Sequence, residues 1–435
     1  MSGVLSLISR TKLYWGLIAI FLLGVLSSPV SSKGNNIFLS YGNLLDVLRQ
    51  VSITGLIATG MTAVIITGGI DLSVGSLMAI CTVVCAMLLT VEGDTTAALF
   101  SLPMAGIVAL AIGFSIVRFV IVNLEKSKSE EQSGRDVALD RTRGLVIPLA
   151  AGAVLAGLLL WFLLPQVPTK FGVLGVLIVA PSVGLCFGAI NGLLIVGGRL
   201  QPFIVTLAMM VTALGIARLT AGQNNAVLPV YTGSNAVAEF DNLRSLVFGI
   251  IPAPGLFFLA AIVLYAAVLR LTPFGRYVYA IGGNEEAARL SGIPTGKVKV
   301  ATYAISGLLA GIAAVLYVAQ YRQGKPDAGA GLELDAIAAV VIGGTSLMGG
   351  RGSMAGTFCG VLIFGLLSNI LQLHNINSNL QLVLKGLIIV GTVLVQERNA
   401  ADLMNFLRLP ARRPAQKGAS VERRRQEETR TLEET

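Results

Sequence analysis

A single carboxylate, Asp71, lies between two strongly apolar runs of the chain. A charged side chain in such a run is expensive to place in a membrane, so it tends to mark a functional position. The residue types allow two interpretations. Asp71 and Ser73 cap a helix that begins near Leu72, since Asp and Ser are preferred N-cap residues, and so support the wall of a pathway. Alternatively, Asp71 contacts a substrate directly.

Three glycines, Gly68, Gly69 and Gly75, surround this carboxylate. They predict an interrupted helix, whose free backbone groups need partners from Asp71, Ser73, neighbouring protein or cavity water.

A second segment, residues 340–353, has a similar sequence pattern: Val-Val-Ile-Gly-Gly-Thr-Ser-Leu-Met-Gly-Gly-Arg-Gly-Ser. Gly343, Gly344 and Ser346 repeat the pattern of an apolar run, a glycine pair and small polar residues. Paired glycine-broken helices in two halves of a chain indicate a transport path at an internal pseudo-symmetry axis. Chance similarity between two glycine-rich helices is the alternative.

A third segment, residues 274–293, is charged and carries the signals of a short helix. Asn284 is expected to cap it, Glu285 and Glu286 favour its first turn, and Gly292 ends it. Its exposed face offers charge to a partner, while the apolar side chains are expected to pack. The alternative is a surface helix without a partner. The residues assigned to partner contact are Asn284, Glu285, Glu286, Ala287, Ala288, Arg289 and Gly292, and Leu290 is expected to pack beside Ala287 and Ala288.

Other chemistry finds little support in the sequence. The nearest approach to a Walker A motif, residues 292–298, has one residue too few between its glycines and no Ser or Thr after the lysine, so nucleotide hydrolysis is not expected on this chain. His374 lies in a short loop with no catalytic or metal-binding neighbours. The cysteines lie inside apolar stretches, which favours buried side chains over a disulfide framework or zinc site: Cys81, Cys85, Cys186 and Cys359. No catalytic residue and no metal ligand is therefore assigned.

The elements that must position these residues are membrane helices. Of the 435 residues, 54% are hydrophobic and 13% charged, against roughly 45–50% and about 25% in a soluble domain. We expect an all-α polytopic membrane protein with about twelve spans. The first apolar run is longer than a signal-peptide core and is taken as a span. The expected spans are 13–30, 46–67, 72–91, 102–123, 145–165, 172–196, 203–221, 247–269, 300–319, 335–349, 353–373 and 380–396, of which 335–349 is short enough to be re-entrant.

The charge of +9 is sorted between the two sides of these spans. With the N-terminus inside, 23 Lys and Arg residues fall on the inner side and 6 on the outer side. The positive-inside rule therefore predicts that both termini, the 124–144 loop and the 270–299 loop are cytoplasmic. The basic balance is thus assigned to the membrane and not to nucleic acid. The transmembrane domain covers 1–396, and the charged tail, 397–435, is expected to be disordered.

Four motifs in order resemble a known family. They are Thr-Gly-Gly-Ile-Asp-Leu-Ser-Val-Gly-Ser at 67–76, Pro-Phe-Ile-Val-Thr-Leu at 202–207, Ala-Ile-Gly-Gly-Asn-Glu-Glu-Ala-Ala-Arg-Leu-Ser-Gly-Ile at 280–293, and Glu-Leu-Asp-Ala-Ile-Ala-Ala-Val-Val-Ile-Gly-Gly-Thr-Ser at 333–346. Together they resemble the permease subunits of ribose/xylose/galactose-type sugar ABC importers. The resemblance runs from about Phe38 through Val390.

The resemblance implies partners and a role for each segment. Residues 274–293 correspond to the cytoplasmic coupling segment that docks on a separate ATPase subunit, which carries the ATP and Mg²⁺; this chain itself binds no cofactor. A periplasmic sugar-binding protein delivers the sugar, and a second permease copy, identical or paralogous, completes the pore in the bilayer. The family has about ten spans, so residues 102–165 look like an inserted helical hairpin around the charged loop 124–144.

The sequence therefore predicts a non-enzymatic, multi-pass permease that imports a monosaccharide across the bacterial inner membrane. Two alternatives stay open. An ion-coupled secondary transporter also fits an inverted repeat and Asp71, although the chain has few intramembrane acids and no histidine relay. A membrane enzyme would need clustered nucleophile, base or metal ligands. Whether the sugar is a pentose, a hexose or a sugar-like signal is left open.

Overall fold

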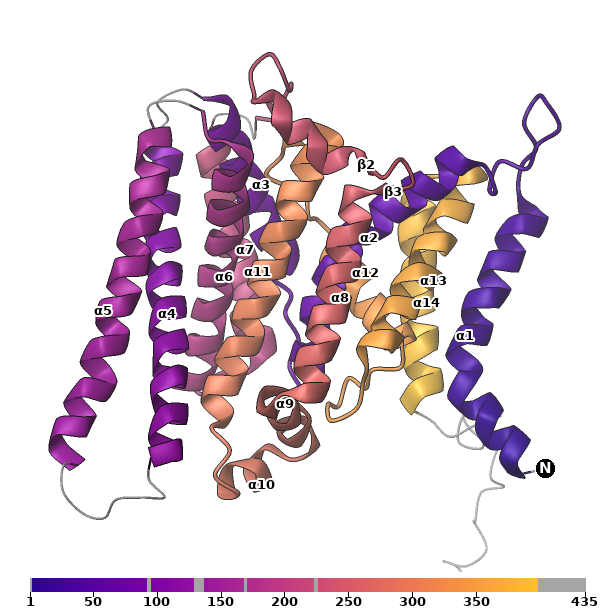
Figure 1. Ribbon diagram of the computed structural model, residues 1–435. Coiled ribbons are helices and arrows are strands. Elements are labelled where there is room, and N and C mark those ends of the chain that lie inside the picture. Colours follow the sequence, from indigo (N-terminus) through magenta and orange to yellow (C-terminus); the bar gives the residue numbers. More distant parts are fainter. Residues whose placement is uncertain (1, 92–94, 129–136, 168–169, 223–225, 398–435) are drawn as a thin grey trace, which may run out of the picture. The chain divides into compact units, whose positions relative to one another are not determined.

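The chain is helical throughout most of its length in a computed structural model (Figure 1), which describes all residues except 1, 92–94, 129–136, 168–169, 223–225 and 398–435. Two units are distinguished, residues 1–386 and residues 387–435. The predicted tail lies outside the described residues, apart from Glu397. The middle of the predicted 124–144 loop, 129–136, also lies outside them.

The helices are α1 (Ser2–Ser27), α2 (Tyr41–Ile66), α3 (Val74–Thr90), α4 (Thr95–Lys128), α5 (Val137–Leu163), α6 (Val173–Gly197), α7 (Pro202–Ala221), α8 (Ala253–Leu271), α9 (Pro273–Gly283), α10 (Glu285–Leu290), α11 (Thr295–Tyr321), α12 (Leu332–Ile342), α13 (Met354–Leu373) and α14 (Ser378–Glu397). Short 3₁₀ turns are η1 (Leu164–Gln166) and η3 (Ala238–Arg244). Two antiparallel pairs of two-residue strands join β1 (Leu228–Pro229) to β4 (Gln323–Gly324) and β2 (Leu246–Val247) to β3 (Ile251–Pro252).

Every apolar segment predicted from the sequence contains a helix. Among the described residues, seven helices are long and apolar enough to cross a membrane, and four shorter apolar helices accompany them. The polytopic all-α prediction is confirmed. The segment 335–349 is the short exception: α12 has 11 residues, which span about 16 Å and fall well short of a bilayer core of about 30 Å.

Helix α8 begins later than the sequence predicted. The apolar segment was expected to start its span at 247, but the β2–β3 hairpin occupies 246–252 and the helix starts at Ala253. Pro252 is the N-cap residue, and a proline lies in the first turn. Proline is tolerated there because the first-turn N–H groups have no intrahelical partner, whereas it disrupts a helix interior.

Glycines bring α6 and α11 into direct backbone contact. A methyl group on Gly184 would overlap the carbonyl oxygen of Gly307, and one on Gly307 would overlap that of Gly184. One turn further along α6, Gly188 lies in the same way against the Tyr303 carbonyl. Small residues are favoured between membrane helices because close backbone approach supplies the packing that the hydrophobic effect cannot supply in lipid.

Helices α4 and α5 form an antiparallel hairpin, seen side by side in Figure 1. Gly113 and Gly152 meet backbone to backbone between them. The helical hairpin predicted over 102–165 is therefore present, while its interpretation as an insertion stays a prediction. Beside it, α3 is buried along nearly its whole length and packs on α6, α7 and α11. The chain enters this buried helix through the residues around Asp71.

Candidate functional site

The interrupted helix predicted around Asp71 is confirmed. Helix α2 ends at Ile66, and Gly68 adopts a left-handed backbone conformation with φ of 78°. The amide of Gly68 donates to the Ile65 carbonyl at 2.9 Å, and that of Gly69 to the Val64 carbonyl at 3.0 Å. This is a Schellman ending, in which glycine supplies the positive φ that other residues rarely adopt. The next helix, α3, starts only at Val74, two residues later than predicted.

Asp71 is fully buried and hydrogen-bonded within the protein. Its Oδ1 accepts from the Ser73 amide at 3.0 Å and from the Ser73 hydroxyl at 2.6 Å, and its Oδ2 accepts from the Ser306 hydroxyl at 3.1 Å. The Asn191 side chain donates to the Ser73 hydroxyl at 2.8 Å. These bonds connect the break to α6 and α11. Three donors on one carboxylate satisfy most of its hydrogen-bonding capacity.

The structure thus supplies partners for Asp71 that the sequence did not single out. Asn191 lies 118 residues from Ser73 in the chain, and Ser306 lies 235 residues from Asp71, so local spacing carries no signal for either contact. Among the described residues, the Asn191 side-chain oxygen and the Tyr303 hydroxyl are buried without a hydrogen-bond partner. Tyr303 lies against Gly69, where an added methyl group would overlap its hydroxyl.

Gly75 permits a close contact on the other side of the break. A methyl group there would overlap the Gly329 carbonyl and the Glu333 carboxylate. The start of α3 is therefore held against the segment that leads into α12. Glycine is needed at position 75 for this close approach and not for its backbone conformation, since its φ is not in the left-handed region.

The second glycine pair forms the same kind of helix ending. Gly344 has φ of 86°, its amide donates to the Val341 carbonyl at 2.8 Å, and the Thr345 amide donates to the Val340 carbonyl at 3.2 Å. In backbone geometry Gly344 corresponds to Gly68, so the two pairs match with a shift of one residue. Ser346 donates its amide to the Arg351 carbonyl at 3.0 Å and accepts from the Met348 amide at 3.2 Å, which shapes the loop before α13.

The short helix predicted after Asn284 is also confirmed. The Asn284 side chain accepts from the Ala287 amide at 2.9 Å, and Gly292 ends the helix with φ of 81°. One expectation is wrong. Ala288 is buried, but Ala287 is exposed and Leu290 is 77% exposed. Because successive helical residues are rotated by about 100°, Leu290 lies about 160° around the helix from Ala288 and cannot share its buried face.

Two ion pairs fix the charged side chains of α10. Arg289 Nε donates to Glu286 at 3.1 Å, and Lys299 of α11 pairs with Glu285 at 2.6 Å. The hydrogen bond from Arg289 lowers the pKa of the Glu286 carboxyl. Both acids and Arg289 are exposed. Beside them a cavity of about 590 Å³ lies between the α6–α7 turn and the start of α11, lined by Arg199 and Lys299 among others.

The helix that leads to α10 touches both helix breaks. A methyl group on Gly282 of α9 would overlap the Ile66 carbonyl and the Gly350 amide, and these two groups are themselves hydrogen-bonded at 2.9 Å. The Tyr279 hydroxyl donates to the Gly352 carbonyl at 3.0 Å. Figure 1 shows α9 and α10 at one end of the helices, beside the loop that precedes α13. Three motifs that are far apart in sequence therefore form one contact, which the sequence did not indicate.

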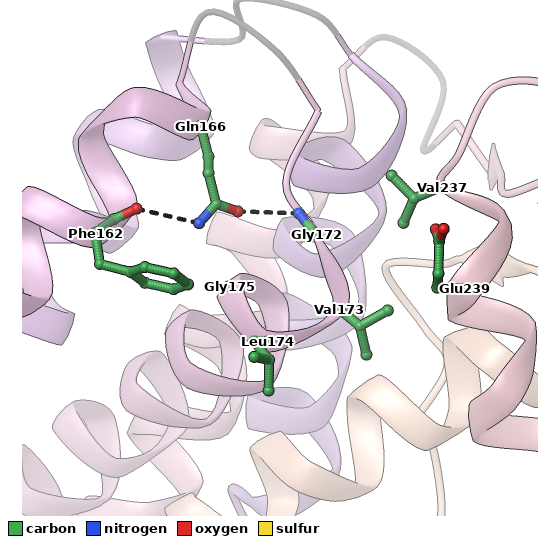
Figure 2. A pocket seen from close by; sticks show the side chains of 8 residues that line it. All are labelled: Phe162, Gln166, Gly172, Val173, Leu174, Gly175, Val237 and Glu239. Atoms are coloured by element: carbon green, nitrogen blue, oxygen red, sulfur yellow. Dashed lines mark hydrogen bonds between the residues drawn. The ribbon is translucent and has the colours of Figure 1, made fainter.

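A separate cavity of about 370 Å³ lies between η1, the start of α6 and η3 (Figure 2). Its lining is largely apolar. The amide of Gln166 is used within the protein, donating to the Phe162 carbonyl at 3.2 Å and accepting from the Gly172 amide at 3.0 Å. Among the described residues on its wall, Glu239 alone carries a charge. We assign it no role.

In the part of the chain that the structure describes, no side chains are arranged as a metal site or a disulfide. No group of three or more His, Cys, Asp or Glu side chains is placed to hold a metal ion there. All four cysteines are free thiols, three of them buried. His374 follows the last residue of α13 and is exposed.

The fold and these motifs define a multi-pass membrane permease. The chain matches the family described as the permease component of the branched-chain amino acid transport system over residues 43–126 and 144–393. It belongs to that family. Both helices of the predicted insertion lie largely within the matched stretches, and residues 127–143 lie between them.

Individual relatives are sugar permeases. The ribose import permease protein RbsC of Bacillus subtilis is 35% identical over 384 residues, which cover 88% of this chain and 92% of the relative. RbsC of Escherichia coli K12 is 34% identical, with coverage of 86% and 91%. The xylose transport system permease protein XylH of the same organism is 32% identical, with coverage of 82% and 85%. No solved structure matches the chain.

Proposed function

We propose that this chain is the permease subunit of an ABC importer that carries a monosaccharide of the ribose or xylose type across the bacterial cytoplasmic membrane. The observation that carries the proposal is its similarity, over more than four fifths of its length, to ribose and xylose permeases. The chain supplies the path, and ATP hydrolysis belongs to a separate subunit. The missing Walker A motif supports this division.

The coupling role belongs to α10 and the end of α9. Glu285, Glu286 and Arg289 form an exposed charged face, and exposed Leu290 adds an apolar side chain that a partner can cover. Behind this face, Gly282 lies against both helix breaks. Docking of an ATPase on α10 would therefore press on the two places where the spanning helices are interrupted.

The orientation follows from charge. The turns at the α10 end of the helices include the 270–299 loop, and Figure 1 places the end of α4 and the start of α5 at that same end. Both regions belong to the positively charged side of the sequence. This supports a cytoplasmic location for α10 and for both termini. A periplasmic binding protein would then deliver the sugar at the opposite end, and a second permease copy would complete the pore.

Reconstitution tests the proposal. In proteoliposomes the purified chain alone should neither hydrolyse ATP nor accumulate ribose or xylose. Adding an ATPase subunit and a sugar-loaded binding protein should start ATP-dependent uptake. Uptake driven by a proton or sodium gradient with this chain alone would instead establish the secondary-transporter alternative.

A further inference from the structure

A small cavity lies between α2, α12 and α13, within the membrane-spanning part of the chain, and polar side chains form part of its wall. Gln50 and Thr54 of α2, Asp335 of α12 and Ser368 of α13 line it together with the ring of Phe364. Thr54 lies about 12 Å along α2 from residue 46, where the predicted span begins, so its polar group is inside the span. The cavity measures about 20 Å³, which is room for about one water molecule.

An ion pair adjoins this cavity. The Lys385 ammonium of α14 lies 2.8 Å from Asp335 Oδ2, and both side chains are more than four fifths buried. The same ammonium lies 5.2 Å from the centre of the Phe364 ring. Ionisable groups inside a membrane protein usually face a pathway or a water-filled cavity. The two charges cancel, so the cluster is neutral as a whole.

These groups have hydrogen-bonding capacity that the protein does not use. Hydroxyls in membrane helices commonly donate to the carbonyl four residues earlier, as those of Thr59 and Thr62 do at 2.7 Å. In the part of the chain that the structure describes, the side chains of Thr54, Ser368 and Gln50 make no hydrogen bond. Lys385 donates one hydrogen bond of its possible three.

Unused polar groups at this depth are costly unless water or a solute meets them. The cluster offers both donors and acceptors, no net charge and one aromatic ring. That combination suits a neutral molecule with several hydroxyl groups. It differs from Asp71, whose oxygens are occupied by Ser73 and Ser306.

We propose that Gln50, Thr54, Ser368 and the Asp335–Lys385 pair bind the hydroxyl groups of the monosaccharide during its passage. This assignment rests on the proposed function. The cavity has room for about one water molecule, so the sugar reaches the cluster only when α12 moves away from α2 and α13.

Removing the unused hydroxyls gives a test with little structural cost. Thr54→Val and Ser368→Ala break no internal hydrogen bond, so membrane abundance should be unchanged. Each should raise the apparent KM for ribose or xylose uptake about 3- to 10-fold, the value of one neutral hydrogen bond. Ser182→Ala is the matched control, since Ser182 and Ser368 are each 5% exposed but the Ser182 hydroxyl donates to Ile178. Wild-type KM in both test variants would overturn the assignment.

Substituting both members of the ion pair distinguishes a binding role from a purely structural one. Replacing a buried pair by neutral residues is often tolerated, whereas removing one partner is not. The double variant Asp335→Asn with Lys385→Met should therefore reach normal abundance. If the pair only holds α14 against α12, this variant also transports normally, and the proposal fails. The proposal expects its apparent KM to remain raised.

Water access gives a readout that does not depend on transport. In a chain without its four native cysteines, Ser368→Cys should react with a small membrane-impermeant thiosulfonate, and Ser182→Cys should not. Failure of Ser368→Cys to react overturns the site, whatever the substrate. A further outcome is that Ser368→Cys reacts but the complete wild-type importer moves neither ribose nor xylose. That outcome supports a hydrated polar path and contradicts only the identity of the proposed sugar.

Discussion

Replacing Gly282 by alanine places a methyl group against the Ile66 carbonyl and the Gly350 amide. Both are backbone atoms, so neither can rotate away as a side chain would. Overpacking of this kind costs about 1–3 kcal/mol, while alanine gains about 0.5–1 kcal/mol over glycine inside a helix. The net cost is about 0–2.5 kcal/mol, and the mid-range value of about 1 kcal/mol corresponds to a factor of roughly 5–10 in the equilibrium between the formed and the broken contact.

The neighbouring residue provides the control. A methyl group on Gly283 meets no atom within 4 Å, and Gly283 belongs to the same helix. Gly283→Ala should therefore keep wild-type behaviour. Neither substitution alters the side chains of α10, so both variants should still co-purify with the ATPase subunit.

The assay is the amount of sugar moved per ATP hydrolysed in proteoliposomes that contain the complete importer. Gly282→Ala should lower this ratio several-fold while ATP hydrolysis continues, because movement of the docked ATPase would no longer be transmitted to the two helix breaks. Equal ratios for the two alanine variants would refute the reasoning. Loss of ATPase binding by Gly282→Ala would mean that the contact serves to shape α10 instead.

Three further predictions concern the charged segment, the buried carboxylate and the topology. Glu285→Lys with Glu286→Lys should abolish ATP-driven uptake and ATPase co-purification at normal membrane abundance, since exposed substitutions usually change stability by less than about 0.5 kcal/mol; wild-type transport would reduce α10 to a surface helix. Asp71→Asn should retain substantial uptake, because the asparagine oxygen can accept from Ser73 and its NH₂ group can donate to Ser306. Asp71→Leu leaves buried donors unpaired at a cost of about 1–3 kcal/mol each, so it should lower the amount of folded protein in the membrane. Equal loss of uptake in both variants would indicate that the charge is required. Cysteines placed in the 270–299 loop should react with impermeant reagents only from the cytoplasmic side, and labelling from outside would disprove both the orientation and the coupling role.

Local signals predicted the local structure well. The cap at Asn284 and the helix ending at Gly292 depend on neighbours within a few residues, and both were predicted. The helix break at Gly68 was predicted for the same reason, since a positive φ favours glycine. The exposed position of Leu290 was not predicted, because the buried face of so short a helix depends on how α10 meets α11.

Contacts between distant segments were beyond sequence reasoning. Nothing in the residues around Gly282 indicates that they lie against Ile66 and Gly350, because a glycine needed for close approach looks like any other glycine. Asp335 and Lys385 each stood in a predicted apolar span, but their pairing depends on how α12 and α14 lie across 50 residues of chain.

The Asp335–Lys385 pair also bears on how the protein is made. Lysine at the middle of a membrane helix opposes insertion by about 2.5–3.5 kcal/mol, and α14 is the last apolar helix among the described residues. Its partner carboxylate is synthesised 50 residues earlier. When α14 leaves the ribosome, α12 already offers the countercharge, so integration of α14 depends on correct assembly of the helices before it. A chain that misfolds upstream would present an uncompensated lysine in α14, which makes that helix a checkpoint for biogenesis.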